Sequence, residues 1–357
     1  MLRLWVTANN LWRKIMAITY KEMHDTFNAL EKTATYLEEK WGDIEKFLDK
    51  KNRFVFIGCG SSYSNAKSYA MICNMSAGKP AMAIAAGDIL LHAERYKKVL
   101  DGAVVVFISR SGRTSELLLA LEAMKARVPD ITVASIISAD DTPLGEKSDF
   151  VLSTPWAFDE SVCQTRCVTN AYFLAAYIAA KAMGDEATLT DLRKTIAAGP
   201  EYTAKAEALA KELAIQPWTH AVVLADAELE GLAEECALVF KEVCQLPSSY
   251  YHVLDVRHGP MVLIGEETLI LIAIGAANDL EINLLRDVKA KGANVIAFSD
   301  VPAEIEGVQI SYFGKPLTHI AKGIPFIILC QMIAYYKSKE TGADPDKPTG
   351  LDAWISL

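Results

Sequence analysis

The chain has 357 residues, of which 51% are hydrophobic and 23% charged, as expected for a globular protein large enough to hold two domains. Its formal net charge of −9 argues against a nucleic-acid-binding surface, which requires clustered lysine and arginine. None of the seven cysteines forms a C-x-x-C pair, so we expect reduced thiols in a cytoplasmic protein, without a disulfide framework or a bound metal.

Residues 1–50 are expected to be mainly helical. From Met23 to Trp41, apolar side chains recur at helical spacing and predict one or two amphipathic helices before the first strand. Residues 1–15 lack the continuous apolar run of a signal peptide, and Met16 is an alternative start of translation. No apolar run reaches the roughly 18 residues that a membrane helix needs, so we expect no membrane partner.

Residues 51–200 are predicted to alternate strands and helices. Short apolar, β-branched runs predict strands at 53–58, 81–87, 103–109, 132–138 and 149–155. Helical patterns cover 61–75 and 114–126. This alternation predicts a parallel sheet with helices on both faces.

Residues 201–340 repeat the scheme. Strands are predicted at 220–226, 269–275, 294–300 and 308–314, and helices at 228–243 and 280–293. Corresponding strand ends lie about 50 residues apart in both halves, which indicates two copies of one unit. We therefore expect an α/β fold with two domains, each a five-stranded parallel sheet between two layers of helices. The domain boundary is expected in the Ala-rich helical stretch near residue 200, and residues 341–357 form a carboxyl-terminal tail.

Two polar clusters follow predicted strands of the first half, "GCGSSYSN" (58–65) and "SRSGRT" (109–114). Ligands of parallel α/β sheets bind at the carboxyl ends of the strands, where hydroxyls and helix amino termini suit a phosphate monoester. Serine and threonine also cap helices, so one such turn means little, but two in one domain favour a phosphate site. Neither cluster matches the G-x-G-x-x-G pattern of dinucleotide-binding proteins or the P-loop pattern of nucleotide-binding proteins, so we expect no cofactor.

In this order, "FIGCGSSY", "VFISRSGRT" and "RHGP" resemble the double sugar-isomerase (SIS) domain proteins, from about residue 50 to the end. That family includes the isomerase half of glucosamine-6-phosphate synthase and deglycases of fructosyl-amino acid 6-phosphates. The resemblance implies two SIS domains and a sugar 6-phosphate held by Ser62, Ser109, Ser111 and Thr114. Further candidates for substrate contact are Gly60, Ser61, Arg110, Arg113, Thr165 and Arg166.

Glu242 and His258 are the candidate catalytic pair, 16 residues apart around the "HGP" turn. A proton shift between C1 and C2 of a sugar requires a general base and a proton donor, and a carboxylate with an imidazole suits neutral pH. By resemblance, Glu242 moves the proton, while His258 assists ring opening and reaches into the site of a neighbouring subunit. This implies a homodimer or larger assembly. On spacing alone, Glu242 would be a solvated charge paired with Lys241 or Lys211.

The chain also departs from glucosamine-6-phosphate synthase. Ala353 stands where that enzyme has a ring-opening lysine, and no glutaminase domain is expected upstream. The second half has "LADAELEG" in place of the first hydroxyl cluster, so we expect one phosphate site per chain. These departures favour deglycation of a ketosamine 6-phosphate over amidotransfer. The alternatives are an amino-sugar 6-phosphate isomerase/deaminase and a non-catalytic sugar-phosphate sensor.

Arg110 and Arg113 have three possible roles. They could reinforce phosphate binding or hold a substrate carboxylate through a bidentate contact. They could instead point to solvent and pair with Glu116 or Asp101, as surface arginines usually do.

Overall fold

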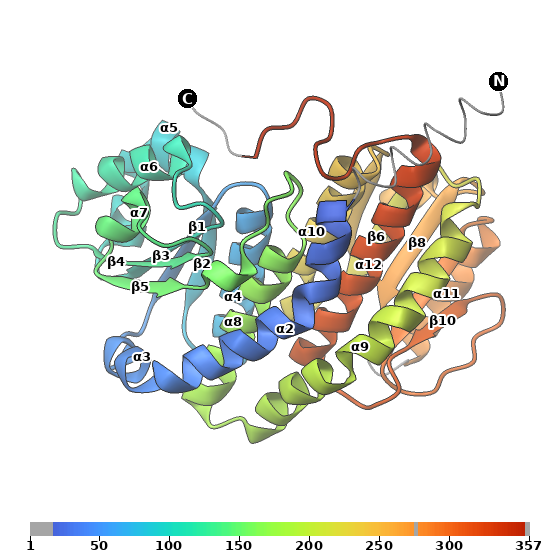
Figure 1. Ribbon diagram of the computed structural model, residues 1–357, viewed down its shortest axis with the longest axis horizontal. Helices are drawn as coiled ribbons and strands as arrows, with labels where there is room; N and C mark the ends of the chain where they lie inside the picture. The colour runs from blue at the N-terminus through green and yellow to red at the C-terminus, as the bar shows by residue number, and fades with distance from the viewer. Residues whose placement is uncertain (1–16, 275–277, 354–357) are drawn as a thin grey trace.

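Two parallel five-stranded sheets dominate the computed structural model, which describes residues 17–274 and 278–353 (Figure 1). The first sheet has the order β2-β1-β3-β4-β5 and the second β7-β6-β8-β9-β10, so the two halves share one topology. The predicted α/β class, with a five-stranded parallel sheet in each half, is confirmed. The alternative start at Met16 lies outside the described residues.

The first sheet comprises β1 (Phe54–Gly58), β2 (Ala81–Ala85), β3 (Val104–Ser109), β4 (Thr132–Ile137) and β5 (Phe150–Ser153). The second comprises β6 (His220–Ala225), β7 (Ser248–His252), β8 (Thr268–Ala273), β9 (Asn294–Ser299) and β10 (Gln309–Tyr312). Every residue of β1, β3 and β8 is buried, because helices cover both faces of a parallel sheet.

The first half contains helices α2 (Ala17–Glu39), α3 (Trp41–Leu48), α4 (Ser61–Met75), α5 (Ala86–Leu100), α6 (Ser115–Lys125), α7 (Pro143–Glu146) and α8 (Arg166–Met183). The second contains α9 (Glu186–Ala214), α10 (Glu230–Val243), α11 (Asp279–Ala290) and α12 (His319–Thr341). The boundary expected near residue 200 lies inside α9, which runs through Pro200 without ending.

One hydrophobic core joins the two halves. It includes the facing sides of both sheets and buried side chains of α2, α4, α8, α9, α10 and α12, and Figure 1 shows α2, α8 and α12 between the sheets. Within this core α10 lies directly on α4, because a Cβ on Gly231 would stand 2.5 Å from the backbone oxygen of Ser64. This contact brings α10 of the second half beside the first polar cluster.

Helix α12 bears on the expected absence of a membrane-spanning segment. Among the described helices, it alone is long and apolar enough to cross a membrane, although its charged and polar residues interrupt any continuous apolar run. In the protein, 94% of its most apolar window is buried. Its composition is therefore that of a central core helix packed between α9 and α10.

Candidate active site

The first polar cluster forms the turn from β1 into α4. A Cβ on Gly58 would lie 2.4 Å from the carbonyl carbon of Ser62, so only glycine allows the helix to start this close to the strand. Gly60 follows with a φ of +53°. The turn buries both Ser61 and Ser62 in the first turn of α4.

The second polar cluster is a tight loop between β3 and α6. The backbone N–H of Gly112 donates to Ser109 Oγ over 2.9 Å, and the N–H of Arg113 donates to Ser111 Oγ over 3.2 Å. Both serines are buried. Thr114 precedes α6 but makes no side-chain cap bond. As acceptors, the Ser109 and Ser111 oxygens keep their own O–H protons available to a ligand.

The two clusters lie at the same edge of the first sheet, because β1 and β3 pair in parallel and both end there. Together they bring the positive ends of two helices and five hydroxyls to one place. These hydroxyls belong to Ser61, Ser62, Ser109, Ser111 and Thr114. We call this group the hydroxyl cradle.

Arg110 is buried, with 5% of its surface exposed, and does not pair with Glu116 or Asp101. Its guanidinium donates to backbone oxygens of the segment before α8, at 2.7 Å to Ser161 and 3.2 Å to Val162. A further bond of 2.7 Å reaches the backbone oxygen of Ala353 in the tail. The solvent-facing interpretation is therefore wrong for Arg110.

Arg113, in contrast, is exposed and donates to the backbone oxygen of Asp141 over 3.0 Å.

Arg166 pairs with Asp25 over 2.6 Å and contacts Asp159, so its charge is balanced within the protein. Thr165 is buried beside it, and its hydroxyl has no partner among the described residues. Of the predicted substrate contacts outside the cradle, Thr165 therefore keeps a free polar group.

Glu242 lies near the carboxyl-terminal end of α10 and is partly buried. Burial raises the pKa of its carboxyl from 4.5 to about 7, and the positive charges of Arg110 and Lys241 act in the opposite direction. Lys211, an alternative partner considered from sequence, pairs instead with Glu207 over 2.8 Å. A carboxyl with a pKa near 7 both accepts and donates protons at neutral pH.

Glu235 is a site residue that the motifs did not single out. It lies two helical turns before Glu242 on the same face of α10 and is completely buried. Burial and the neighbouring Glu242 charge raise its pKa well above 4.5, while the nearby Ser61 hydroxyl lowers it. The seven-residue spacing of two glutamates in a helical pattern was the available signal. Glu235 links the hydroxyl cradle to Glu242.

His258 lies apart from this group in the described chain. It follows a short 3-10 helix (Asp255–Arg257) and is exposed, and the next turn presents Val262 and Leu263 with 81% and 66% of their surfaces exposed. The structure therefore brings Glu242 together with the cradle, and leaves His258 on an apolar surface loop.

The raised pKa of Glu242 predicts a pH-dependent stability. Since the folded state binds this proton more tightly than the unfolded state, the free energy of unfolding falls as pH rises from about 4.5 to 7. Glu242→Gln removes this fall, so the stability of the variant relative to wild type should increase by about 3 kcal/mol between pH 4 and pH 8. Urea denaturation across this range measures it, and a constant difference would contradict the assignment.

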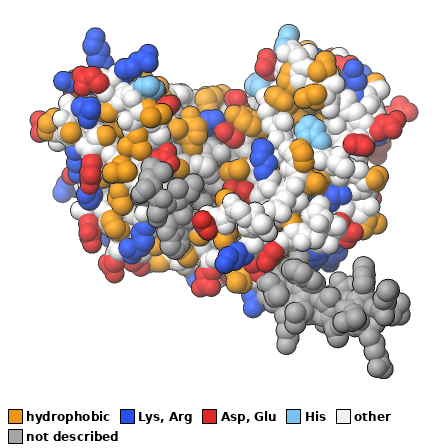
Figure 2. All heavy atoms as spheres, turned by 90° about the horizontal axis from the view of Figure 1, so that it is seen from above, with side chains coloured by type: hydrophobic (Ala, Val, Ile, Leu, Met, Phe, Trp, Pro, Cys, Tyr) orange, Lys and Arg blue, Asp and Glu red, His pale blue; other side chains and the backbone are white. Residues whose placement is uncertain are grey.

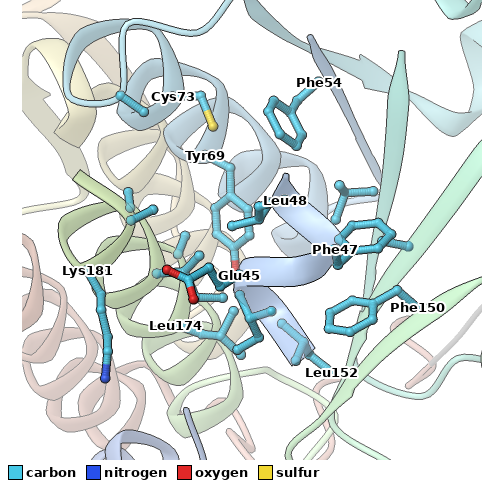
Figure 3. Close-up of a pocket in the computed structure, with 18 of the residues that line it drawn as sticks. Glu45, Phe47, Leu48, Phe54, Tyr69, Cys73, Phe150, Leu152, Leu174 and Lys181 are labelled. Atoms are coloured by element: carbon cyan, nitrogen blue, oxygen red, sulfur yellow. The ribbon is translucent and has the colours of Figure 1, made fainter. Parts of the chain in front are cut away.

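A cavity of about 780 Å³ lies elsewhere, between α3 and the first sheet (Figure 3). Figure 3 shows Phe47, Leu48, Phe54, Tyr69 and Phe150 around it. Phe54 and Phe150 begin their strands, whereas the cradle follows strand ends, so this cavity lies toward the opposite edge of the sheet. No predicted site residue lines it.

The face seen from above in Figure 1 is indented between two lobes, and Lys, Arg, Asp and Glu side chains are interspersed on it (Figure 2).

Comparison with known proteins agrees with this architecture. Residues 47–181 match the SIS domain family. The glutamine–fructose-6-phosphate aminotransferase (isomerizing) of Methanothermobacter thermautotrophicus is 26% identical over 350 residues, covering 94% of this chain and 57% of that protein. The chain thus spans little more than half the length of this curated relative.

Two solved structures share the fold. The tagatose-6-phosphate ketose/aldose isomerase from Escherichia coli superposes with a TM-score of 0.80 at 20% identity, covering 95% of this chain and 98% of that one. The glucosamine-6-phosphate deaminase from Thermotoga maritima gives 0.75 at 24% identity, covering 96% and 100%.

Proposed function

We propose that this chain, a SIS-domain protein, is an enzyme that acts on a hexose 6-phosphate at C1 and C2. The observation that carries the proposal is the partly buried Glu242 carboxyl, whose pKa of about 7 suits proton transfer, in one site with the hydroxyl cradle. The cradle holds the phosphate through hydroxyls and backbone N–H groups at two helix starts. Sugar 6-phosphates also appear in the names of the relatives and neighbours.

Within this class we favour a deglycase acting on a ketosamine 6-phosphate. Glu242 removes a proton from C1 of the open-chain substrate, and a proton returned to C2 gives an imine between C1 and the amine nitrogen. Water adds to C1 and the C–N bond breaks, releasing glucose 6-phosphate and the free amine. His258 serves as the acid for the sugar oxygen. Ala353 supports this branch, because no lysine amine stands at that tail position.

The neighbouring deaminase structure supports an alternative, the isomerisation and deamination of an amino-sugar 6-phosphate. The two reactions share the C1–C2 proton shift and differ in the carbon that carries nitrogen. Glu242 and the cradle serve both.

An assay of the purified protein with fructoselysine 6-phosphate tests the proposal. We expect release of glucose 6-phosphate, followed by a coupled dehydrogenase, with one equivalent of lysine. Turnover of glucosamine 6-phosphate alone would select the deaminase branch. Thermal stabilisation by both compounds without turnover would instead identify a sugar-phosphate sensor and overturn the enzymatic proposal.

Shared active sites in a homodimer give a further prediction. We propose that the apolar turn at Val262 and Leu263 packs on a second copy and carries His258 to the partner's Glu242. Glu242→Gln and His258→Asn should each be inactive alone. Mixed after reversible dissociation, they should recover about a quarter of wild-type activity, because half of the dimers are mixed and each has one intact site. No recovery in verified mixed dimers would place both residues in one subunit's site.

A further inference from the structure

The carboxyl-terminal tail crosses the site between two anchors. Gln245, just after α10, donates through Nε2 to the backbone oxygen of Thr349 over 3.2 Å. Four residues later, the backbone oxygen of Ala353 accepts from Arg110 over 2.7 Å. Leu351, between the anchors, packs against the main core. Because Glu242 lies three residues before Gln245 and within the field of Arg110, residues 349–353 pass over its side of the site.

Arg110 also fixes the segment on the other side of this crossing. Its guanidinium holds the backbone oxygens of Ser161 and Val162, while the Val162 N–H donates to the backbone oxygen of Asp346 over 2.9 Å. One buried cation thus joins the cradle loop, the segment before α8 and the tail. Arg110 contacts four backbone oxygens, and none of them carries a formal charge. These contacts therefore do not neutralise the positive charge of its guanidinium.

We propose that Arg110 is a positioning residue that clamps the tail over Glu242 and supplies the positive charge that keeps this carboxylate usable as a base. The inference rests on the proposed function of Glu242. A loop arginine that served only the phosphate would instead leave its guanidinium directed toward the cradle, free of the tail carbonyl.

The charged and titratable groups that act on Glu242 come from three parts of the chain: the loop before α6, α10 itself and the segment before α8. Arg110, from the loop before α6, and Lys241, on α10 itself, both lower its pKa. Glu235 on α10 and the thiol of Cys163 also interact with the Glu242 charge. Burial raises the pKa of Glu242, and the positive charges of Arg110 and Lys241 lower it, Arg110 more than Lys241. Removal of Arg110 should therefore raise the Glu242 pKa further above its ordinary value.

The test compares Arg110→Gln with Arg110→Lys, using two readouts. In Arg110→Gln, the acid limb of kcat/KM should move to higher pH by about one unit, which lowers the rate at pH 7 by about fivefold. Amide hydrogen exchange of residues 346–353 should become faster. Arg110→Lys keeps the charge and loses the forked contacts, so its acid limb should stay near that of wild type while tail exchange rises.

Two matched variants separate charge from anchoring. Arg113→Gln removes one charge from the same loop and should leave both the acid limb and tail exchange in place, whatever its effect on KM. Gln245→Asn removes the other anchor with a residue that tolerates the φ of +54° there, and should speed tail exchange without moving the acid limb. An unchanged acid limb and unchanged tail exchange in a folded Arg110→Gln protein would overturn the proposal. Hydrogen exchange requires no substrate, so it tests the clamp even if the proposed reaction is wrong.

Discussion

Glu242→Gln should reduce kcat on the cognate sugar phosphate by about 10³-fold, because an amide cannot accept the C1 proton. The partly buried carboxyl has a pKa of about 7, so at neutral pH a substantial fraction is ionised and can act as a base. Substrate binding should persist, since the phosphate is held by the cradle and not by α10. Steady-state kinetics together with ligand-induced thermal shifts measure both quantities.

The matched control is Glu234→Gln, one residue from Glu235 on the same helix. Glu234 pairs with Lys67 over 2.5 Å and takes no part in the proposed proton transfer. The kcat of this variant should stay within about twofold of wild type, as expected for loss of a partly exposed ion pair. If Glu242→Gln kept more than a tenth of the wild-type rate, another group would have to be the base.

Gly58→Ala should strongly destabilise the protein, although it adds only one methyl group. The added Cβ would lie 2.4–2.6 Å from the carbonyl carbon and oxygen of Ser62 and the nitrogen of Tyr63. These are backbone atoms, which cannot move away as the end of a flexible side chain can. We expect a loss of about 3 kcal/mol in the free energy of unfolding. Displacement of Ser62 should also abolish sugar-phosphate stabilisation.

Gly60→Ala provides the comparison two residues away. A Cβ there meets nothing within 4 Å, so the cost comes from the backbone conformation alone. Its φ of +53° with a ψ of −128° lies outside the left-handed helical region and is rarely adopted by residues other than glycine, which should cost about 2 kcal/mol. Urea denaturation of both variants separates steric from conformational strain. Equal losses in the two proteins would mean that the β1–α4 turn relaxes, and that its close approach does not position Ser62.

Sequence patterns predicted the sheets well because buried parallel strands are continuous apolar runs, as in β3 and β8. They missed β7, whose residues are Ser-Ser-Tyr-Tyr-His, because an edge strand need not be fully apolar and this one is only partly buried. The sequence patterns also failed to predict helix α12. Because this helix is buried on nearly all sides, its sequence lacks the alternation of apolar and polar faces on which the prediction of a helix depends.

The two arginines of the cradle loop show why the site could be predicted only in part. Glycine and hydroxyl positions are local, so Gly58, Ser62 and Ser109 could be identified from short motifs. The orientation of the Arg110 guanidinium depends on backbone oxygens about 50 and 240 residues away in sequence. Nothing within "SRSGRT" distinguishes it from Arg113, which faces solvent. Because every residue has a backbone oxygen, the residue types in a sequence do not reveal which oxygens a distant arginine will contact.

The position of α12 has a consequence for how this protein is made. The helix contacts α8, α9 and α10, yet it is encoded by residues 319–341, more than a hundred residues after the end of α8. During synthesis, the core shared by the two halves therefore stays open until residues 319–341 have emerged from the ribosome. Until then, the nascent chain should expose the apolar surfaces of α8, α9 and α10, to which chaperones can bind.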